Sequence, residues 1–356
     1  MKYTFEIQKL MFQAEDNKSL TPKDKINLLR QAAAIADDND DIQWGYDVRM
    51  ELLTETYKLA SETDLVENFV WIVNAYDEHP DWFDESDFLW KYKWVINSMY
   101  HNPDLSVEQI DAVFEDFKTR LTRNGYGLRA YYERWYGRKM AARQYEEARK
   151  YLDLRNDLPT DDMTNCQACT LDVELDYYLQ TGHFEEAYNR AQPLLAKQIT
   201  PCAHVPIRTF CKFAYYADKL GKDSIAEEMK KEAIAGIESL DNDENLTEHT
   251  AMLISYLAGK DNEQALYFLQ KSLPWHLDDN YFGKYEYANY LSEALSKMDE
   301  SSTCKLDLPS EFEAYCSDDT YSIKDLKAYF ASTAKQLAKA FDERDQIDTY
   351  SKALLL

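Results

Sequence analysis

The stretch Gly182-His183-Phe184-Glu185-Glu186-Ala187 has counterparts at a fixed spacing on both sides. Ala148, Ala226 and Ala265 occupy the place of Ala187, and successive alanines are 39 residues apart. A fixed period of this length is typical of stacked helix-turn-helix units, in which a small residue lets the second helix of each unit lie close to the first. The repeat therefore predicts an all-α array.

The turn inside each unit has its own signal. Gly182 and Gly221 stand five residues before the repeated alanine, where a helix end favours a residue that tolerates positive φ. Arg143 and Lys260 occupy the equivalent places in the outer units. We expect all four residues to form the turn.

The repeat resembles the tetratricopeptide repeat, which has Gly-x-Tyr/Phe-x-x-Ala at this point and an aromatic residue four places before the glycine, here Tyr178. The resemblance covers residues 128–275 and implies a right-handed superhelical array of helix-turn-helix units. The period of 39 exceeds the family's period of about 34 residues. Longer connections are therefore expected between units, for example at residues 195–201.

A narrower resemblance rests on three segments. They are Trp90-Lys91-Tyr92-Lys93-Trp94, the Cys-x-x-Cys at residues 166–169, and the Cys-x-x-Val-Pro-x-Arg-Thr at residues 202–209. Together they resemble a group of bacterial tetratricopeptide-like proteins. This resemblance implies the repeat fold and adds no function.

The chain divides into three parts. We expect helical hairpins continuous with the array over residues 1–125, tetratricopeptide-like repeats over 126–276 and a C-terminal helical cap over 277–356. Thr21-Pro22 is typical of an N-cap followed by proline at the first helical position. In the cap, we predict a loop or short turn at residues 304–317.

An aromatic patch lies between Trp82 and Tyr100. Its alternating aromatic residues favour a strand, but Ser86 and Asp87 offer helix caps, Pro103 follows the patch and no strand signals adjoin it, so we predict a helix. Core packing is the simpler role for this patch. An aromatic ligand pocket is the alternative.

Composition and charge restrict the function. The chain has 40 basic and 65 acidic residues, a net charge of −25, which disfavours nucleic acid and anionic membranes and favours basic partners. Acidity that only maintains solubility is the other explanation. With no signal-peptide pattern and no long apolar run, we expect a cytoplasmic protein. Its oligomeric state stays open.

One group of residues has the spacing of metal ligands. Cys166 and Cys169 open one repeat, and Cys202 and His204 precede the next. First helices of neighbouring repeats lie about 8–10 Å apart, so the two pairs should converge. Three thiolates and an imidazole suit a structural zinc ion, the single cofactor we expect. Packing at the repeat junction and redox or disulfide chemistry are the alternatives, and Asp161 or Asp162 could replace the imidazole.

No nucleotide-binding, metalloprotease or serine-hydrolase motif occurs, so we assign no catalytic residue. The family resemblance instead implies a concave groove, and the acids and the aromatic residue at its positions suit a basic or amphipathic protein or peptide. These positions correspond to Asp172, Asp176, Arg208, Tyr215 and Asp218. The alternative is that these positions are solvated or pack between repeats.

The leading expectation is a non-catalytic protein- or peptide-binding scaffold or regulator that sequesters a basic partner, as an immunity-type protein does. A metal-dependent hydrolase that uses the Cys/His cluster is one alternative. A small-molecule sensor that uses the aromatic patch is another.

Overall fold

The computed structural model describes residues 2–17, 19–58, 62–202, 204–240 and 244–356. Across these ranges the chain forms seventeen α-helices, one short 3-10 helix and one two-stranded hairpin, which confirms the all-α prediction. Among these helices, none combines the length and apolar character that a membrane crossing needs.

The N-terminal helices are α1 (Lys2–Asp16), α2 (Pro22–Asp38), α3 (Ile42–Lys58), α4 (Glu62–Glu78), α5 (Glu85–Tyr100) and α6 (Val107–Arg123). The repeat region contains α7 (Arg129–Ala141), α8 (Tyr145–Asn156), α9 (Gln167–Gln180), α10 (Phe184–Leu195), α11 (Ile207–Lys219), α12 (Asp223–Glu238), the 3-10 helix η1 (Glu244–Leu246), α13 (Thr247–Leu257) and α14 (Asn262–Asp278). The C-terminal part contains α15 (Tyr281–Ser296), β1 (Thr303–Lys305), β2 (Thr320–Ser322), α16 (Ile323–Asp345) and α17 (Thr349–Lys352).

The repeated alanines have equivalent places in the fold. Ala148, Ala187, Ala226 and Ala265 are each the fourth residue of their helix, α8, α10, α12 and α14 respectively, and each is at most 1% exposed. No larger side chain fits such contacts without displacing a neighbouring helix. The structure thus confirms the helix-turn-helix repeat that the spacing predicts.

The predicted turn is correct in three of the four repeats. Arg143, Gly182 and Gly221 have φ values of 56°, 81° and 66°. In the last repeat Lys260 also lies in the turn, but Gly259, with φ of 83°, has the left-handed conformation in its place, so only the positive φ expected of Lys260 was wrong. Helix α13 ends at Leu257, one residue early in the period. Gly259 therefore occupies the position of positive φ, which glycine adopts without steric cost.

The aromatic patch is helical, as predicted. Asp84 caps α5, accepting a hydrogen bond of 2.9 Å from the Ser86 amide, and the helix ends at Tyr100. Phe88 and Tyr92 are fully buried, whereas Trp94 is only partly buried. This difference leaves Trp94 available to line a cavity.

Residues 304–317 were predicted to form a loop or short turn. In the structure, the first two of them belong to strand β1 of a hairpin. Strands β1 and β2 pair antiparallel, with Cys304 opposite Tyr321. Three-residue strands of this kind are too short to give a periodic signal in the sequence. The prediction of a simple loop or short turn was therefore wrong at the start of this stretch.

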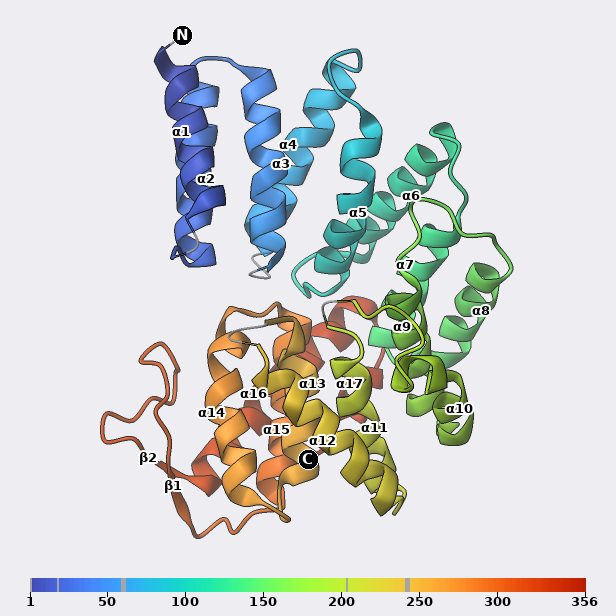
Figure 1. Cartoon of the computed structure of the whole chain (residues 1–356), viewed down its shortest axis with the longest axis vertical. Helices are drawn as coiled ribbons and strands as arrows, with labels where there is room; N and C mark the ends of the chain where they lie inside the picture. Colours follow the sequence, from blue (N-terminus) through green and yellow to red (C-terminus); the bar gives the residue numbers. More distant parts are fainter. Residues whose placement is uncertain (1, 18, 59–61, 203, 241–243) are drawn as a thin grey trace.

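The array curves until its two halves meet. In Figure 1, α1–α6 form the upper part, α7–α10 the right-hand side and α11–α17 the lower part. Arg344 of α16 donates hydrogen bonds of 2.8 and 2.9 Å to the carbonyls of Tyr100 and Asn102. The His101 ring stacks on Phe282, with centroids 4.6 Å apart. These contacts enclose the concave interior.

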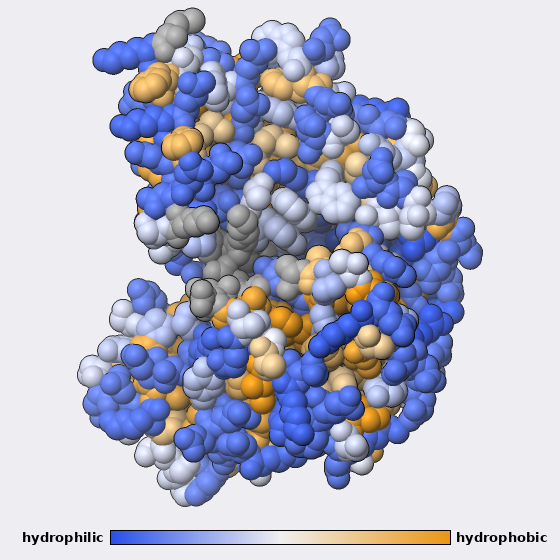
Figure 2. Space-filling model, viewed as in Figure 1, coloured by the Kyte–Doolittle hydropathy of each residue, from blue (hydrophilic) through white to orange (hydrophobic). Residues whose placement is uncertain are grey.

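The outer surface matches the charge of the chain. The face shown in Figure 2 is mainly hydrophilic and is hollowed between the upper and lower parts. The concave interior is therefore the candidate region for a binding site.

Candidate functional site

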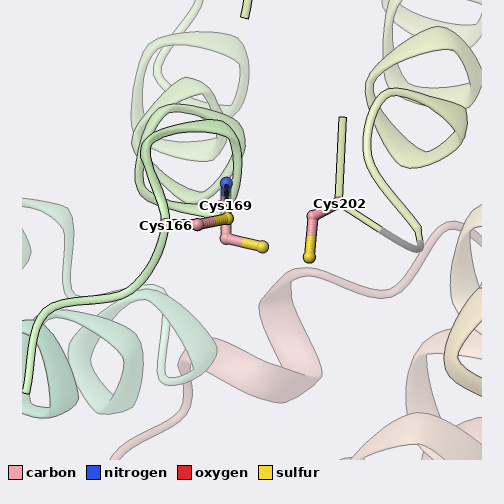
Figure 3. A group of neighbouring side chains, drawn as sticks. All are labelled: Cys166, Cys169 and Cys202. Carbon is pink, nitrogen blue, oxygen red and sulfur yellow. Dashed lines mark hydrogen bonds between the residues drawn. The ribbon is translucent and has the colours of Figure 1, made fainter. Parts of the chain in front are cut away.

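Three predicted metal ligands lie together. Cys166, Cys169 and Cys202 place their sulfur atoms within 4.8 Å of one another, and Figure 3 shows Cys166 and Cys169 on one segment and Cys202 on another, facing them. Cys166 is the N-cap of α9, and Cys169 lies in the first turn of that helix. Cys202 belongs to the turn before α11, where it forms a β-bridge with Val205. The repeat spacing thus brings adjacent units together here.

The local environment favours one thiolate. Burial works against charge on Cys166, but the Cys169 amide and the neighbouring thiols outweigh it and lower the Cys166 pKa below its usual value. Burial is the main cause of the raised Cys169 pKa, with the Cys166 and Cys202 thiols adding to it. A cation would stabilise all three as thiolates.

The fourth predicted ligand, His204, and its possible replacements Asp161 and Asp162 lie outside the three-sulfur group that the described residues form. Asp161 accepts hydrogen bonds from the amides of Gly127 and Met163, so it organises the loop that precedes the Cys-x-x-Cys. The structure brings together three of the four predicted ligands.

A buried lysine, overlooked in the sequence, supports the same loop. The Lys93 ammonium donates hydrogen bonds to the Met163 carbonyl at 2.8 Å and to Asn165 at 3.0 Å. It also lies 3.1 Å from the Trp90 ring centroid. Burial, reinforced by Arg134, lowers its pKa to about 7. Lys93 therefore anchors the segment leading to Cys166 to helix α5.

The predicted groove residues divide into two sets. Asp172, Asp176 and Arg208 line an internal cavity. Tyr215 is buried, and its hydroxyl donates a hydrogen bond of 2.9 Å to Glu293. Asp218 forms an ion pair with Lys260. The first set faces the interior, and the second connects neighbouring helices.

The interior contains two adjoining chambers. The first, of about 260 Å³, is bounded by α5, α13 and the start of α15, and Tyr57 and Trp94 lie in its wall. The second, of about 200 Å³, is bounded by α7, α9, α11 and α13. Five residues line both chambers: His101, Arg208, Glu248, His249 and Phe282.

The charges in the second chamber are unevenly paired. The Lys212 ammonium lies 3.1 Å from Asp172 and 2.8 Å from Asp176, and Arg143 pairs with Glu286. Burial raises the Asp176 pKa to about 6, although Lys212 opposes the shift. One ammonium therefore serves a buried carboxylate, Asp172, and a partly exposed one, Asp176.

Glu248 has no such partner. Its carboxylate makes no hydrogen bond or ion pair with any residue that the structure describes. Burial, reinforced by the charge of Glu286, raises its pKa to about 7 despite the positive charges of Lys212, Arg143 and Arg208. Sequence inspection missed Glu248 because the chain contains many acidic residues.

No family model matches the chain, and no curated protein is significantly similar to it. A functional assignment therefore depends on the sites themselves.

Proposed function

We propose that the protein is a non-catalytic helical-repeat scaffold or regulator that binds a protein or peptide in its concave interior. The observation that carries this proposal is the pair of chambers lined by charged groups from the first helices α9, α11 and α13. A concave site with a few converging polar groups is the usual form of a ligand site. The net charge of −25 supports a basic partner.

Photo-crosslinking tests this proposal. A photoreactive phenylalanine analogue replaces Tyr57, which lines the first chamber, and the protein is irradiated in its host cells. A control places the same group at Tyr315, which is 41% exposed and lies between β1 and β2. We expect a discrete crosslinked species from position 57 that is absent from position 315. The same pattern from both positions, or no product from position 57, contradicts the proposal.

We also propose that zinc joins two repeats through Cys166, Cys169 and Cys202. Three sulfur ligands suit zinc. Tetrahedral bonds of about 2.3 Å would set the sulfurs roughly 3.8 Å apart, near the separation of at most 4.8 Å seen here. His204 or a water molecule would supply the fourth ligand. A cytoplasmic location, where thiols stay reduced, is consistent with this role. Native mass spectrometry of protein purified without chelator tests it, and a metal-free mass would contradict it.

The sensor alternative gains support from one contact. Trp94 of the aromatic patch lines the first chamber, so a small ligand there would alter its surroundings. The hydrolase alternative requires a substrate cleft beside the metal ligands. Neither chamber includes a cysteine of the cluster.

A further inference from the structure

The two chambers contain polar groups that the protein itself does not satisfy. His249 is 8% exposed, and its Nδ1 atom has no hydrogen-bond partner among the residues that the structure describes. Within the same residues, Ser98 Oγ and Arg208 Nε are also buried without partners. Such groups destabilise a folded protein unless a ligand or water pairs with them. All three residues line the first chamber.

The balance of charge indicates the sign of the ligand. Four carboxylates face or adjoin the second chamber, against three cationic side chains. They are Asp172, Asp176, Glu248 and Glu286, with Arg143, Arg208 and Lys212. Three of the carboxylates already have a cation, and Arg208 donates to the Asn245 carbonyl at 3.1 Å. Among the described residues, neither Glu248 nor Arg208 makes an ion pair, and the group keeps one more carboxylate than it has cations, so a ligand that restores neutrality is positively charged.

The neighbours of Glu248 suit a charged hydrogen-bond donor. His249 stays neutral because burial and the nearby positive charges of Lys212 and Arg208 keep its pKa well below the usual value. A neutral imidazole can accept a hydrogen bond. The stacked pairs Tyr57–Trp94 and His101–Phe282 form aromatic walls beside these groups. Aromatic walls lower the local dielectric, so the pairing of opposite charges beside them is stronger than in bulk water.

We propose that the first chamber binds an ammonium or guanidinium group between its aromatic walls. The bound cation forms an ion pair with Glu248 and donates a hydrogen bond to His249. The inference rests on the proposed binding function and specifies its ligand. The cation belongs either to a lysine or arginine side chain of a peptide or to a free small amine. Both sources present the same chemistry to Glu248.

Matched ligands that differ only in charge test this inference. Butylguanidinium and its neutral analogue butylurea represent the free ligand. Acetyl-Gly-Arg-Gly-amide and the same peptide with citrulline represent a side chain. Ligand-observed NMR at pH 7.5 gives each dissociation constant. We expect each cation to bind roughly tenfold or more tightly than its neutral analogue, because a charge-assisted hydrogen bond is lost with the charge.

Variants locate the site. Glu248→Gln should abolish the preference for the cation, whereas Glu146→Gln, at an exposed residue of α8, should leave it intact. The glutamine variant leaves no cation unpaired, since Glu248 has no ion-pair partner in the described structure. Its fold is checked by circular dichroism. Tighter binding of the arginine peptide than of butylguanidinium identifies a peptide source, and the reverse identifies a free amine.

Two results overturn the inference. One is equal binding of the charged and neutral analogues, or no binding of either cation at 10 mM, roughly the weakest affinity expected for a fragment of this size. The other is a cation preference that survives Glu248→Gln. If crosslinking at position 57 still captures a partner, the binding scaffold stands and only the cationic ligand is wrong. If crosslinking also fails, both proposals fall.

Discussion

Replacement of Glu248 by glutamine should stabilise the unliganded protein at alkaline pH. The carboxyl lies beside Glu286, and the positive groups Lys212, Arg143 and Arg208 act on it without a direct contact. Its pKa rises from 4.5 to about 7 on folding. A carboxyl with a raised folded pKa binds its proton more tightly in the folded state. Stability is therefore lost as pH rises from the unfolded to the folded pKa.

The size of the effect follows from this shift. A rise from 4.5 to about 7 corresponds to a penalty of at most about 3.4 kcal/mol above pH 7. Below the unfolded pKa the penalty vanishes. Water in the chamber reduces the effect, since the side chain is only partly buried. We expect the stabilisation by Glu248→Gln to increase by about 1–2 kcal/mol between pH 5 and pH 8.

Urea denaturation at both pH values measures the change. Glu146→Gln serves as the control, because residue 146 is exposed and its substitution should change the free energy of unfolding little at either pH. Asp176 and Glu286, whose pKa values are also raised by burial, affect wild type and variant alike and largely cancel in the difference. A stabilisation that is equal at pH 5 and pH 8, or a destabilised variant at pH 8, would refute the reasoning.

Three further substitutions address packing, charge pairing and metal binding. Lys212→Met leaves the buried Asp172 carboxylate and the partly exposed Asp176 carboxylate of α9 without their cation and should lower the free energy of unfolding by about 3 kcal/mol, the lower end of the range for a broken buried pair. Lys150→Met, which removes an exposed pair, should cost less than about 1 kcal/mol by the same urea assay. Ala187→Leu overfills a fully buried contact and should cost about 1–3 kcal/mol, measured by thermal unfolding. Cys202→Ser should reduce zinc content by elemental analysis, while Cys304→Ser, outside the cluster, should retain it.

The repeat could be predicted because packing repeats with the sequence. Each buried alanine makes the same close helix contact, so the residue recurs at a fixed interval. Helix α5 could be predicted because candidate caps and Pro103 bracket it in the sequence, but its N-cap is Asp84, two residues before the expected cap Ser86. The error at Lys260 arose where α13 ends one residue early. A strict period cannot anticipate such a local change.

The metal ligands were partly predictable, and the cavity was not. Cys166 and Cys202 occupy neighbouring repeat starts, so the period alone brings them close. The first chamber instead combines Trp94 of α5 with Glu248 of α13 and Phe282 of α15. Their approach depends on how far the array curves, which many small helix contacts determine together. No local sequence pattern predicts the curvature that results from these contacts.

The first helices nevertheless explain why Glu248 lacks a partner. Arg208 and Glu248 are each the second residue of their helices, α11 and α13. Lys212, four residues after Arg208, lies on the same helical face and pairs with the acids of α9. Lys212 is the sixth residue of α11, and its partners lie on the preceding first helix, α9. Helix α15 packs on α13, and its sixth residue is Glu286, which has a negative charge where α11 has a lysine. The carboxylate of α13 therefore has an acid on the following helix in place of a cation, and it faces both chambers.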